Sequence, residues 1–410
     1  MGRGASAAIA AAAGLLACAV AGCGAPQPTL TLGAVFPLQG PTAALAGEEL
    51  RGAQLAVQLV NDDGGVHGDR IALDVRSVAD GAGIASAVAS FHRDGVPAVI
   101  GAYSSELSIP AATAVARQGM VYWETGAVAD QLTGAGLRSV FRIGADGAEL
   151  GGNSAAFALQ RLGLRASQLR VFLVTAGDAY ATSVAAGVVG GLRGSAAQVV
   201  GQQLYDPYAP QWPPVIAAIR AARPNVIMLS AHIADGVAFR RAFVAAGLHA
   251  AGFIGTTMAQ CVPDFGRDLG TEAYGVYASD RPSGDFNPTV LDPAARSLYD
   301  RFAAAWRQDT GAAPDEEAVA GFSATWALLD DVLPRAGSLT PGAIAAAARS
   351  LDLPDGSLPN GAGIRFATDP AHLGQNQRAA AVVQEWGPSG ERTVWPPAYA
   401  TAAPLPASRW

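Results

Sequence analysis

Two adjacent serines, Ser104 and Ser105, stand where the chain is best suited to bind an anion. They follow a short apolar run, Ala98 to Ile100, which is typical of a buried parallel strand. A helix-like segment comes next, with Pro110 early in it, where a missing backbone N–H costs little. Free N–H groups and the positive end of the helix dipole meet at such a turn, so a carboxylate or another anion is favoured there. The alternative is that Ser105 or Ser108 only caps the helix, which is the commoner role of serine.

Strands and helices must alternate around this turn if it is to be held in place. Apolar runs predict strands over residues 30–36, 71–78, 98–100, 120–123 and 140–143, and again over 171–174, 199–205, 226–230 and 252–255. Helix-like segments separate them, and three late helices (294–309, 316–333 and 341–350) precede two late strands (364–366 and 379–386). Two successive runs of this alternation predict two doubly wound parallel sheets, an α/β fold. In open α/β sheets, ligands bind at the carboxyl ends of the strands.

Composition and motifs exclude several classes of function. The 410 residues suffice for two domains, and the formal charge of −7 gives no reason to expect nucleic acid as a partner. Gly81 to Ser86 imitates a dinucleotide fingerprint but lacks its last small residue, and no P-loop, G-x-S-x-G or H-E-x-x-H motif occurs. Cys261 has no evident histidine partner. We therefore predict a protein that is not an enzyme and uses neither a cofactor nor a metal.

The first residues are typical of an export signal. Arg3 precedes an apolar stretch, Ala7 to Val20, that is too short for a confident membrane span. Val20-Ala21-Gly22-Cys23 resembles a bacterial lipobox, which implies a lipoprotein signal peptide over 1–22, cleavage before Cys23 and lipidation of its sulfur. Residues 23–29 would then form the lipidated tether. The alternative is a plain secreted or uncleaved segment.

Several longer stretches share their order and spacing with a known family. They are Leu32–Pro41, Glu49–Ala53, Asn61–Gly68, Val99–Gly101 with the two serines, Thr125–Ala127, Ala246–Leu248 and Phe253–Gly255. Together they resemble the type I periplasmic solute-binding proteins, in particular the branched-chain amino-acid (Leu/Ile/Val) receptors of ABC importers. The resemblance runs from about Leu30 to Trp386.

This resemblance implies two doubly wound lobes joined by three crossovers, with a ligand cleft between them. We place the crossovers near Ile143, Val276 and Phe366. Lobe 1 then comprises residues 30–143 and 277–365, and lobe 2 comprises residues 144–276 and 366–396. Residues 397–410, rich in Pro and Ala, are expected to form a flexible tail. In the family the lobes close on the ligand by hinge motion.

The resemblance also implies ligand contacts from lobe 1. Ser105, beside Ser104, falls where a serine holds the ligand carboxylate. Gly126 and Val128 fall where backbone groups and a threonine hydroxyl complete that contact, although Val128 replaces the threonine. These residues predict a carboxylate site with one polar contact fewer than the family pattern.

Lobe 2 departs further from the family pattern. Tyr180 falls where a tyrosine covers the ligand, and His232 lies near a position that is often aromatic, although each could be an ordinary residue at a helix start or strand end. Thr257 falls about where amino-acid binders place an acid for the α-ammonium. A buried ammonium without an anion is costly. Either Glu124 or Asp235 replaces that acid, or the ligand lacks an ammonium; Glu124 could equally be solvated.

These observations predict a lipid-anchored, extracytoplasmic protein that captures a small polar solute for an ABC importer by lobe closure. The solute would be an amino acid or a related small carboxylate or amide, and the partners would be permease subunits in the membrane. The alternative is a ligand sensor of the same fold that feeds a signalling partner, because fold does not decide between these roles. An extracytoplasmic enzyme is a more distant possibility.

Overall fold

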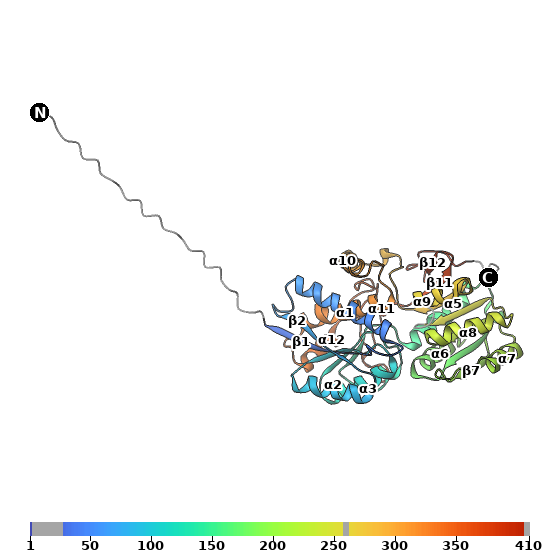
Figure 1. Cartoon of the computed structure of the whole chain (residues 1–410), viewed down its shortest axis with the longest axis horizontal. Helices are drawn as coiled ribbons and strands as arrows, with labels where there is room; N and C mark the ends of the chain where they lie inside the picture. Colours follow the sequence, from blue (N-terminus) through green and yellow to red (C-terminus); the bar gives the residue numbers. More distant parts are fainter. Residues whose placement is uncertain (2–27, 257–261, 406–410) are drawn as a thin grey trace.

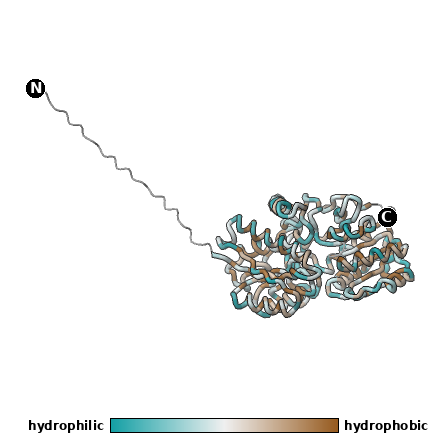
Figure 2. The backbone as a smooth tube through the Cα atoms, viewed as in Figure 1, coloured by the Kyte–Doolittle hydropathy of each residue, from teal (hydrophilic) through white to brown (hydrophobic). Residues whose placement is uncertain are grey.

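The computed structural model describes residue 1, residues 28–256 and residues 262–405, and these form two lobes side by side (Figure 1). Hydrophobic residues lie in the middle of each lobe, and hydrophilic residues predominate on the outer helices (Figure 2). The expected α/β class with two doubly wound sheets is confirmed. Among the described residues, no helix combines the length and apolarity that crossing a bilayer requires.

Lobe 1 is built on a five-stranded parallel sheet. Its order is β2 (Arg70–Ser77), β1 (Thr29–Phe36), β3 (Ala98–Gly101), β4 (Val121–Glu124) and β5 (Val140–Arg142). Its helices are α1 (Ala43–Asp62), α2 (Gly81–Arg93), α3 (Ser105–Arg117), α4 (Gln131–Gly134), α10 (Pro293–Thr310), α11 (Glu316–Trp326) and α12 (Pro341–Ser350). A π-helical turn (Ala327–Val332) and a short 3₁₀ turn (Leu333–Arg335) continue α11.

Side-chain alternation along β1 explains why helices cover both faces of this sheet. Leu32 and Phe36 point into the core formed with α1 and α11, whereas Val35 points into the core formed with α2 and α3. Successive side chains of a strand point to opposite faces, so an uninterrupted apolar strand needs apolar cover on both sides.

Lobe 2 is built on a seven-stranded sheet. Its order is β12 (Gly390–Trp395), β11 (Val382–Gly387), β10 (Val276–Asp280), β9 (Gly252–Thr256), β8 (Val226–Ser230), β6 (Arg170–Ala176) and β7 (Gln198–Tyr205). β11 pairs antiparallel with both β10 and β12, and the other strand pairs of this sheet are parallel. Its helices are α5 (Gly147–Arg161), α6 (Ala179–Leu192), α7 (Trp212–Ala222), α8 (Ile233–Ala245) and α9 (Pro263–Leu269), and 3₁₀ turns lie at Ala166–Gln168 and Gly270–Ala273. A further 3₁₀ turn, Pro288–Val290, precedes α10.

Two of the expected crossovers lie further along the chain than the sequence indicated. β10 pairs with β9 and β11 inside the seven-stranded sheet, so the chain leaves lobe 2 after Asp280 and not at Val276. Residues after Phe366 still belong to lobe 1, because Gln375 pairs with Arg142 at the edge of β5. The third crossover therefore lies between Asn376 and β11.

The C-terminal segment also differs from the expectation. β12 was not predicted, and residues of the expected tail make hydrogen bonds to the rest of the protein. The Tyr399 hydroxyl donates to the Gly361 carbonyl (2.9 Å), and the Leu405 N–H donates to the Glu385 carboxylate (2.8 Å). Residues 406–410 lie outside the described part of the chain.

Glycines let two helix pairs approach closely, α1 with α11 and α5 with α6. A Cβ atom on Gly151 of α5 would lie 2.1 Å from the Val184 carbonyl oxygen of α6, whereas one on the neighbouring Gly152 would meet nothing within 4 Å. The two positions therefore give a matched test of this packing.

We expect Gly151→Ala to lower the free energy of unfolding by about 1–3 kcal/mol, because the extra methyl group must displace backbone. Gly152→Ala should leave it unchanged or raise it by up to about 1 kcal/mol, since alanine favours the helix. Chemical denaturation of both variants measures the difference. Equal effects of the two substitutions would contradict the close packing of α5 against α6.

Candidate functional site

The lobes meet where the first turns of α3 and α6 and the loops before α4, α7 and α8 come together. The Tyr208 hydroxyl of lobe 2 lies 3.4 Å from the Glu106 carboxylate of lobe 1, and the Asp130 N–H donates to Ser183 Oγ across the interface (3.1 Å). Ile233 packs against the cores of both lobes. All these residues follow the carboxyl ends of parallel strands, so the strand ends of both sheets face one interface, where open α/β sheets bind ligands.

The two serines lie on the lobe 1 side of this interface. Ser104 occupies the N-cap position of α3, but its side chain makes no capping hydrogen bond. Ser105 is 6% exposed, and its Oγ accepts a hydrogen bond from the Ala129 N–H (3.1 Å), which ties the loop after β3 to the loop after β4. Ser108 accepts from the Ala102 N–H (3.0 Å). Among the described residues, the hydroxyl hydrogen of Ser105 has no acceptor, so it can donate to a ligand.

Glu124, predicted as a possible ligand contact, organises the neighbouring loop. It is fully buried, and its Oε1 accepts from the N–H groups of Thr125, Gly126 and Ala127 (3.1, 2.8 and 2.7 Å). Its Oε2 accepts from the Tyr122 hydroxyl (3.0 Å). Burial raises the pKa of Glu124, and the N–H donors partly offset this rise. The Gly126 N–H, expected to reach a ligand carboxylate, is therefore already occupied.

Val128 is turned toward lobe 2. Its side chain is 4% exposed and packs in the lobe 2 core, and its carbonyl accepts from the Gly147 N–H at the first crossover (2.7 Å). Val128 thus joins the lobes by apolar contact, where the family pattern has a hydroxyl.

Tyr180 and His232 come together on the lobe 2 side. Their rings are 5.4 Å apart in an edge-on arrangement. The Tyr180 hydroxyl donates toward the carbonyls of Ala231 and Thr256 (3.1 and 2.6 Å), which fixes the ring against the ends of β8 and β9. His232 Nε2 lies 2.8 Å from the Asp178 carboxylate.

Asp235, the other acid considered for a ligand ammonium, is also occupied. It is 5% exposed, and its carboxylate accepts a hydrogen bond from the Tyr205 hydroxyl. Burial raises its pKa, which the Tyr205 hydroxyl partly offsets. Thr257 and Cys23, the remaining predicted site residues, lie outside the described residues.

A buried group of charged residues at the junction of the lobes was not among the predicted site residues. We call it the Arg281 cluster; it consists of Glu49, Tyr103, Asp280, Arg281, Glu316 and Glu317, all at most 4% exposed. Arg281 Nη1 donates to the Gly126 carbonyl (2.8 Å), and the guanidinium lies 2.5 Å from Glu316 and 3.3 Å from Glu317. The only sequence signals were an acidic helix start at α11 and an arginine directly after a strand.

Burial dominates the electrostatics of this cluster. Burial raises the pKa of Glu49 to about 8, and the charge of Glu124 adds to this rise. Burial also raises the pKa of Glu316 to about 8, and the charge of Asp280 adds to that rise. Burial and the charge of Glu316 raise the pKa of Glu317 well above its usual range. Burial alone would lower the pKa of Arg281, but the surrounding carboxylates outweigh it and raise the pKa.

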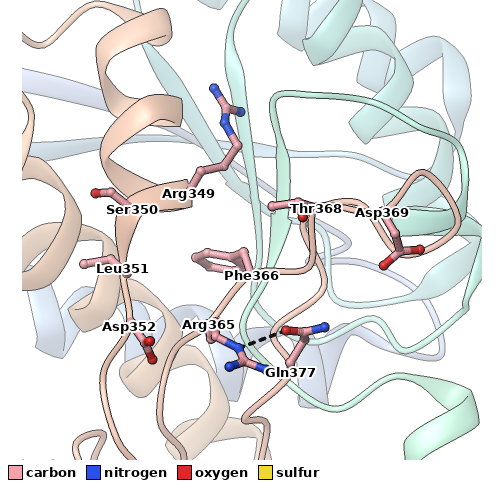
Figure 3. A pocket seen from close by; sticks show the side chains of 9 residues that line it. All are labelled: Arg349, Ser350, Leu351, Asp352, Arg365, Phe366, Thr368, Asp369 and Gln377. Carbon is pink, nitrogen blue, oxygen red and sulfur yellow. Dashed lines mark hydrogen bonds between the residues drawn. The ribbon is translucent and has the colours of Figure 1, made fainter.

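A cavity of about 390 Å³ lies elsewhere, between the end of α12 and the segment before the third crossover (Figure 3). Its lining is Arg349, Ser350, Leu351, Asp352, Arg365, Phe366, Thr368, Asp369 and Gln377. Arg349 already donates to the Arg138 carbonyl (2.7 Å) and Arg365 to Gln377 (3.0 Å), so both cations are engaged. None of the predicted site residues lines this cavity. Within the described part of the chain, no group of side chains is placed to hold a metal ion.

Two α/β lobes, three crossovers and strand ends that face one interface define the class of two-lobed solute-binding proteins. The sequence profile described as periplasmic binding protein matches residues 29–390, and the chain belongs to this family. The family places the protein outside the cytoplasm and confirms the prediction of a binding protein instead of an enzyme.

Individual relatives cover almost the whole chain. A Leu/Ile/Val-binding protein homolog of Brucella abortus is 26% identical over 376 residues, which are 89% of this chain and 90% of that protein. The branched-chain amino acid transporter substrate-binding protein of Streptococcus pneumoniae, in complex with isoleucine, has a TM-score of 0.73 at 19% identity and covers 90% of this chain and all of that one. A leucine-, isoleucine-, valine-, threonine- and alanine-binding protein of Brucella ovis, in a closed conformation, has a TM-score of 0.73 at 21% identity and covers 88% and 90%.

The pairing of His232 with Asp178 predicts a pH dependence. Burial alone would lower the pKa of His232, but the Asp178 hydrogen bond and the charges of Asp178, Asp235 and Glu106 outweigh it and raise the pKa. The stabilisation from charged His232 is therefore complete below its unfolded pKa of about 6.5. It is lost as the pH rises through the raised value.

We expect His232→Gln to lower the unfolding free energy at pH 5.5, by less than about 1 kcal/mol because the side chain is partly exposed, and to have no effect at high pH. Unfolding experiments on both proteins, from pH 5.5 to high pH, measure this difference in unfolding free energy. Asp178→Asn is the control, because asparagine can still cap α6 but should lower the His232 pKa in an NMR titration. An unchanged His232 pKa in that variant would contradict the assigned cause.

Proposed function

We propose that this protein captures a branched-chain α-amino acid between its lobes and delivers it to an ABC importer. The observation that carries the proposal is that the strand ends of both sheets meet at one interface, with Ser105 on one side and Tyr180 on the other. The names of its relatives support it, since they refer to a homolog of Leu/Ile/Val-binding proteins, to a branched-chain amino acid transporter substrate-binding protein in complex with isoleucine, and to a protein that binds leucine, isoleucine, valine, threonine and alanine. Binding would proceed by capture and lobe closure, without catalysis.

In this proposal the ligand carboxylate lies at the start of α3. Ser105 donates its hydroxyl hydrogen to it, and the helix dipole of α3 adds attraction near Ser104. Tyr180 and His232 cover the ligand from lobe 2, and Val128 packs against its aliphatic part. The Gly126 N–H reaches the ligand only if it leaves Glu124. Thr257 stays a predicted contact.

Ser105→Ala tests the carboxylate contact. Loss of a hydrogen bond to a charged group costs about 1.5–3 kcal/mol, so the affinity for L-leucine, L-isoleucine or L-valine should fall about 10- to 150-fold. Calorimetric titration of the chain begun at Pro26 measures it. Ser154→Ala is the control, because the Ser154 hydroxyl bonds only within α5. If none of the three amino acids binds the unsubstituted protein, the proposal is wrong.

We also infer that residues 1–22 direct export and that Cys23 carries a lipid anchor. Only a short segment separates Cys23 from the first strand, which begins at Thr29. An anchored protein would therefore stay close to the membrane and its permease. Stable anchoring by acyl chains requires more than one chain.

Cys23→Ala should move the protein from the membrane fraction to the soluble fraction, because its sulfur is the proposed attachment atom. Fractionation of cells expressing either form measures this. Cys18→Ala is the control and should keep the protein on membranes. Unchanged membrane retention of the Cys23 variant would exclude the anchor.

A further inference from the structure

The Arg281 cluster lies at the junction of the lobes, directly behind the lobe 1 loops that carry Ser105 and Gly126. Tyr103 ends the turn after β3, two residues before Ser105. The Glu49 carboxylate occupies the space that a side chain at position 126 would fill, since a Cβ there would lie within 2.8 Å of its carboxyl carbon. Glu316 and Glu317 form the first turn of α11, which packs along α1.

Carboxyl groups outnumber cations in this cluster. Four buried carboxyl groups surround the single guanidinium of Arg281, and Glu391 on β12 acts electrostatically on Asp280 and Glu316. Two carboxylate oxygens of the cluster, Glu49 Oε2 and Glu317 Oε1, have no hydrogen-bond partner among the described residues, whereas Glu316 is paired with Arg281. Buried carboxylates without compensation are costly, so the site favours either protons or an added cation.

The Tyr103 hydroxyl is a second, independent observation that favours a polar ligand at this cluster. The side chain is 3% exposed, and its oxygen has no hydrogen-bond partner within the described chain. Glu317, Glu316 and Glu49 are close enough to raise its pKa further, after burial. A buried hydroxyl is almost always hydrogen-bonded, so this one is available to a polar partner from outside the described residues.

We propose that the Arg281 cluster, with Tyr103, binds the ammonium group of the captured amino acid. This inference rests on the proposed function and moves the cation contact from the position predicted for Thr257 to the lobe 1 acids Glu49, Glu316 and Glu317. The other acids near the interface, Glu124 and Asp235, already hold hydrogen bonds. An α-amino acid carries both charged groups on one carbon, so a carboxylate at Ser105 places the ammonium beside the loops that cover the cluster.

Binding of a cation here should release protons. Glu49 and Glu316 have pKa values raised to about 8, so they are largely protonated in the free protein at pH 7. An ammonium group lowers these pKa values, and up to about one proton leaves for each ligand bound. Affinity should therefore rise with pH up to about 8 and then level off.

The first experiment compares L-leucine with 4-methyl-2-oxopentanoate, which has the same skeleton and carboxylate but no ammonium. Titration calorimetry at pH 7 in two buffers of different ionisation enthalpy counts the protons released. We expect release with L-leucine and none with the oxo acid.

The second experiment uses Tyr103→Phe and Glu317→Gln. Removal of an unpartnered hydroxyl should not lower the melting temperature, whereas the affinity for L-leucine should fall about tenfold and that for the oxo acid should not change. Glu317→Gln keeps the shape of the side chain and should reduce the preference for L-leucine by tenfold or more. Tyr399→Phe is the control, because it loses a hydrogen bond to Gly361 far from the cluster and should lower stability without changing affinity.

The outcomes separate the two proposals. L-leucine binding without proton release, and unaffected by Tyr103→Phe and Glu317→Gln, would leave the proposed function standing and overturn the ammonium site. Binding of the oxo acid in place of L-leucine would also overturn it. If neither compound nor L-isoleucine nor L-valine binds, the proposed function fails and this inference fails with it.

Discussion

The junction of the lobes depends on one buried guanidinium, that of Arg281. Arg281 follows β10 directly, at the second crossover, and its donors reach the loop after β4 and the first turn of α11. The first crossover passes close by, since a Cβ on Gly144 would lie 3.1 Å from Arg281 Cδ. One side chain therefore joins two crossovers, a strand-end loop and a helix start. Its removal would leave several carboxyl groups buried without a cation, which is strongly destabilising.

The loops at the interface are held by side-chain acceptors and donors because they lie beyond the ends of the sheets. In lobe 1, Glu124 accepts three consecutive N–H groups and Ser105 accepts a fourth. In lobe 2, the Tyr180 hydroxyl joins the carbonyls at the ends of β8 and β9. Both sets of bonds form within a lobe, so each loop is shaped before the lobes close. Such preorganisation reduces the entropy that binding must overcome.

The fold could be predicted from the sequence because buried parallel strands leave apolar runs between helices. The errors arose where tertiary pairing decides. β12 carries Glu391 and Arg392 and is not an apolar run, so it was not recognised as a strand. Residues 397–405 were expected to be flexible because their hydrogen-bond partners, such as Glu385, lie in another strand. The candidate site was predictable only where it follows strand ends. Arg281 could not be linked to its partners, because Glu317 is 36 residues away and Gly126 is 155 residues away.

Division of the ligand contacts between the lobes has a consequence for closure. If lobe 1 holds both charged ends of an amino acid, the open protein can already bind the ligand, and lobe 2 adds only Tyr180, His232 and apolar cover. A ligand favours the closed state only by the contacts that exist in that state. The described contacts across the interface are otherwise modest, such as the pair of Glu106 and Tyr208 and the packing of Ile233. The aliphatic side chain of the ligand, held between Val128 and Tyr180, would then drive closure. In that case the charged groups of the ligand would determine which class of compound binds, and its side chain would determine how far the lobes close.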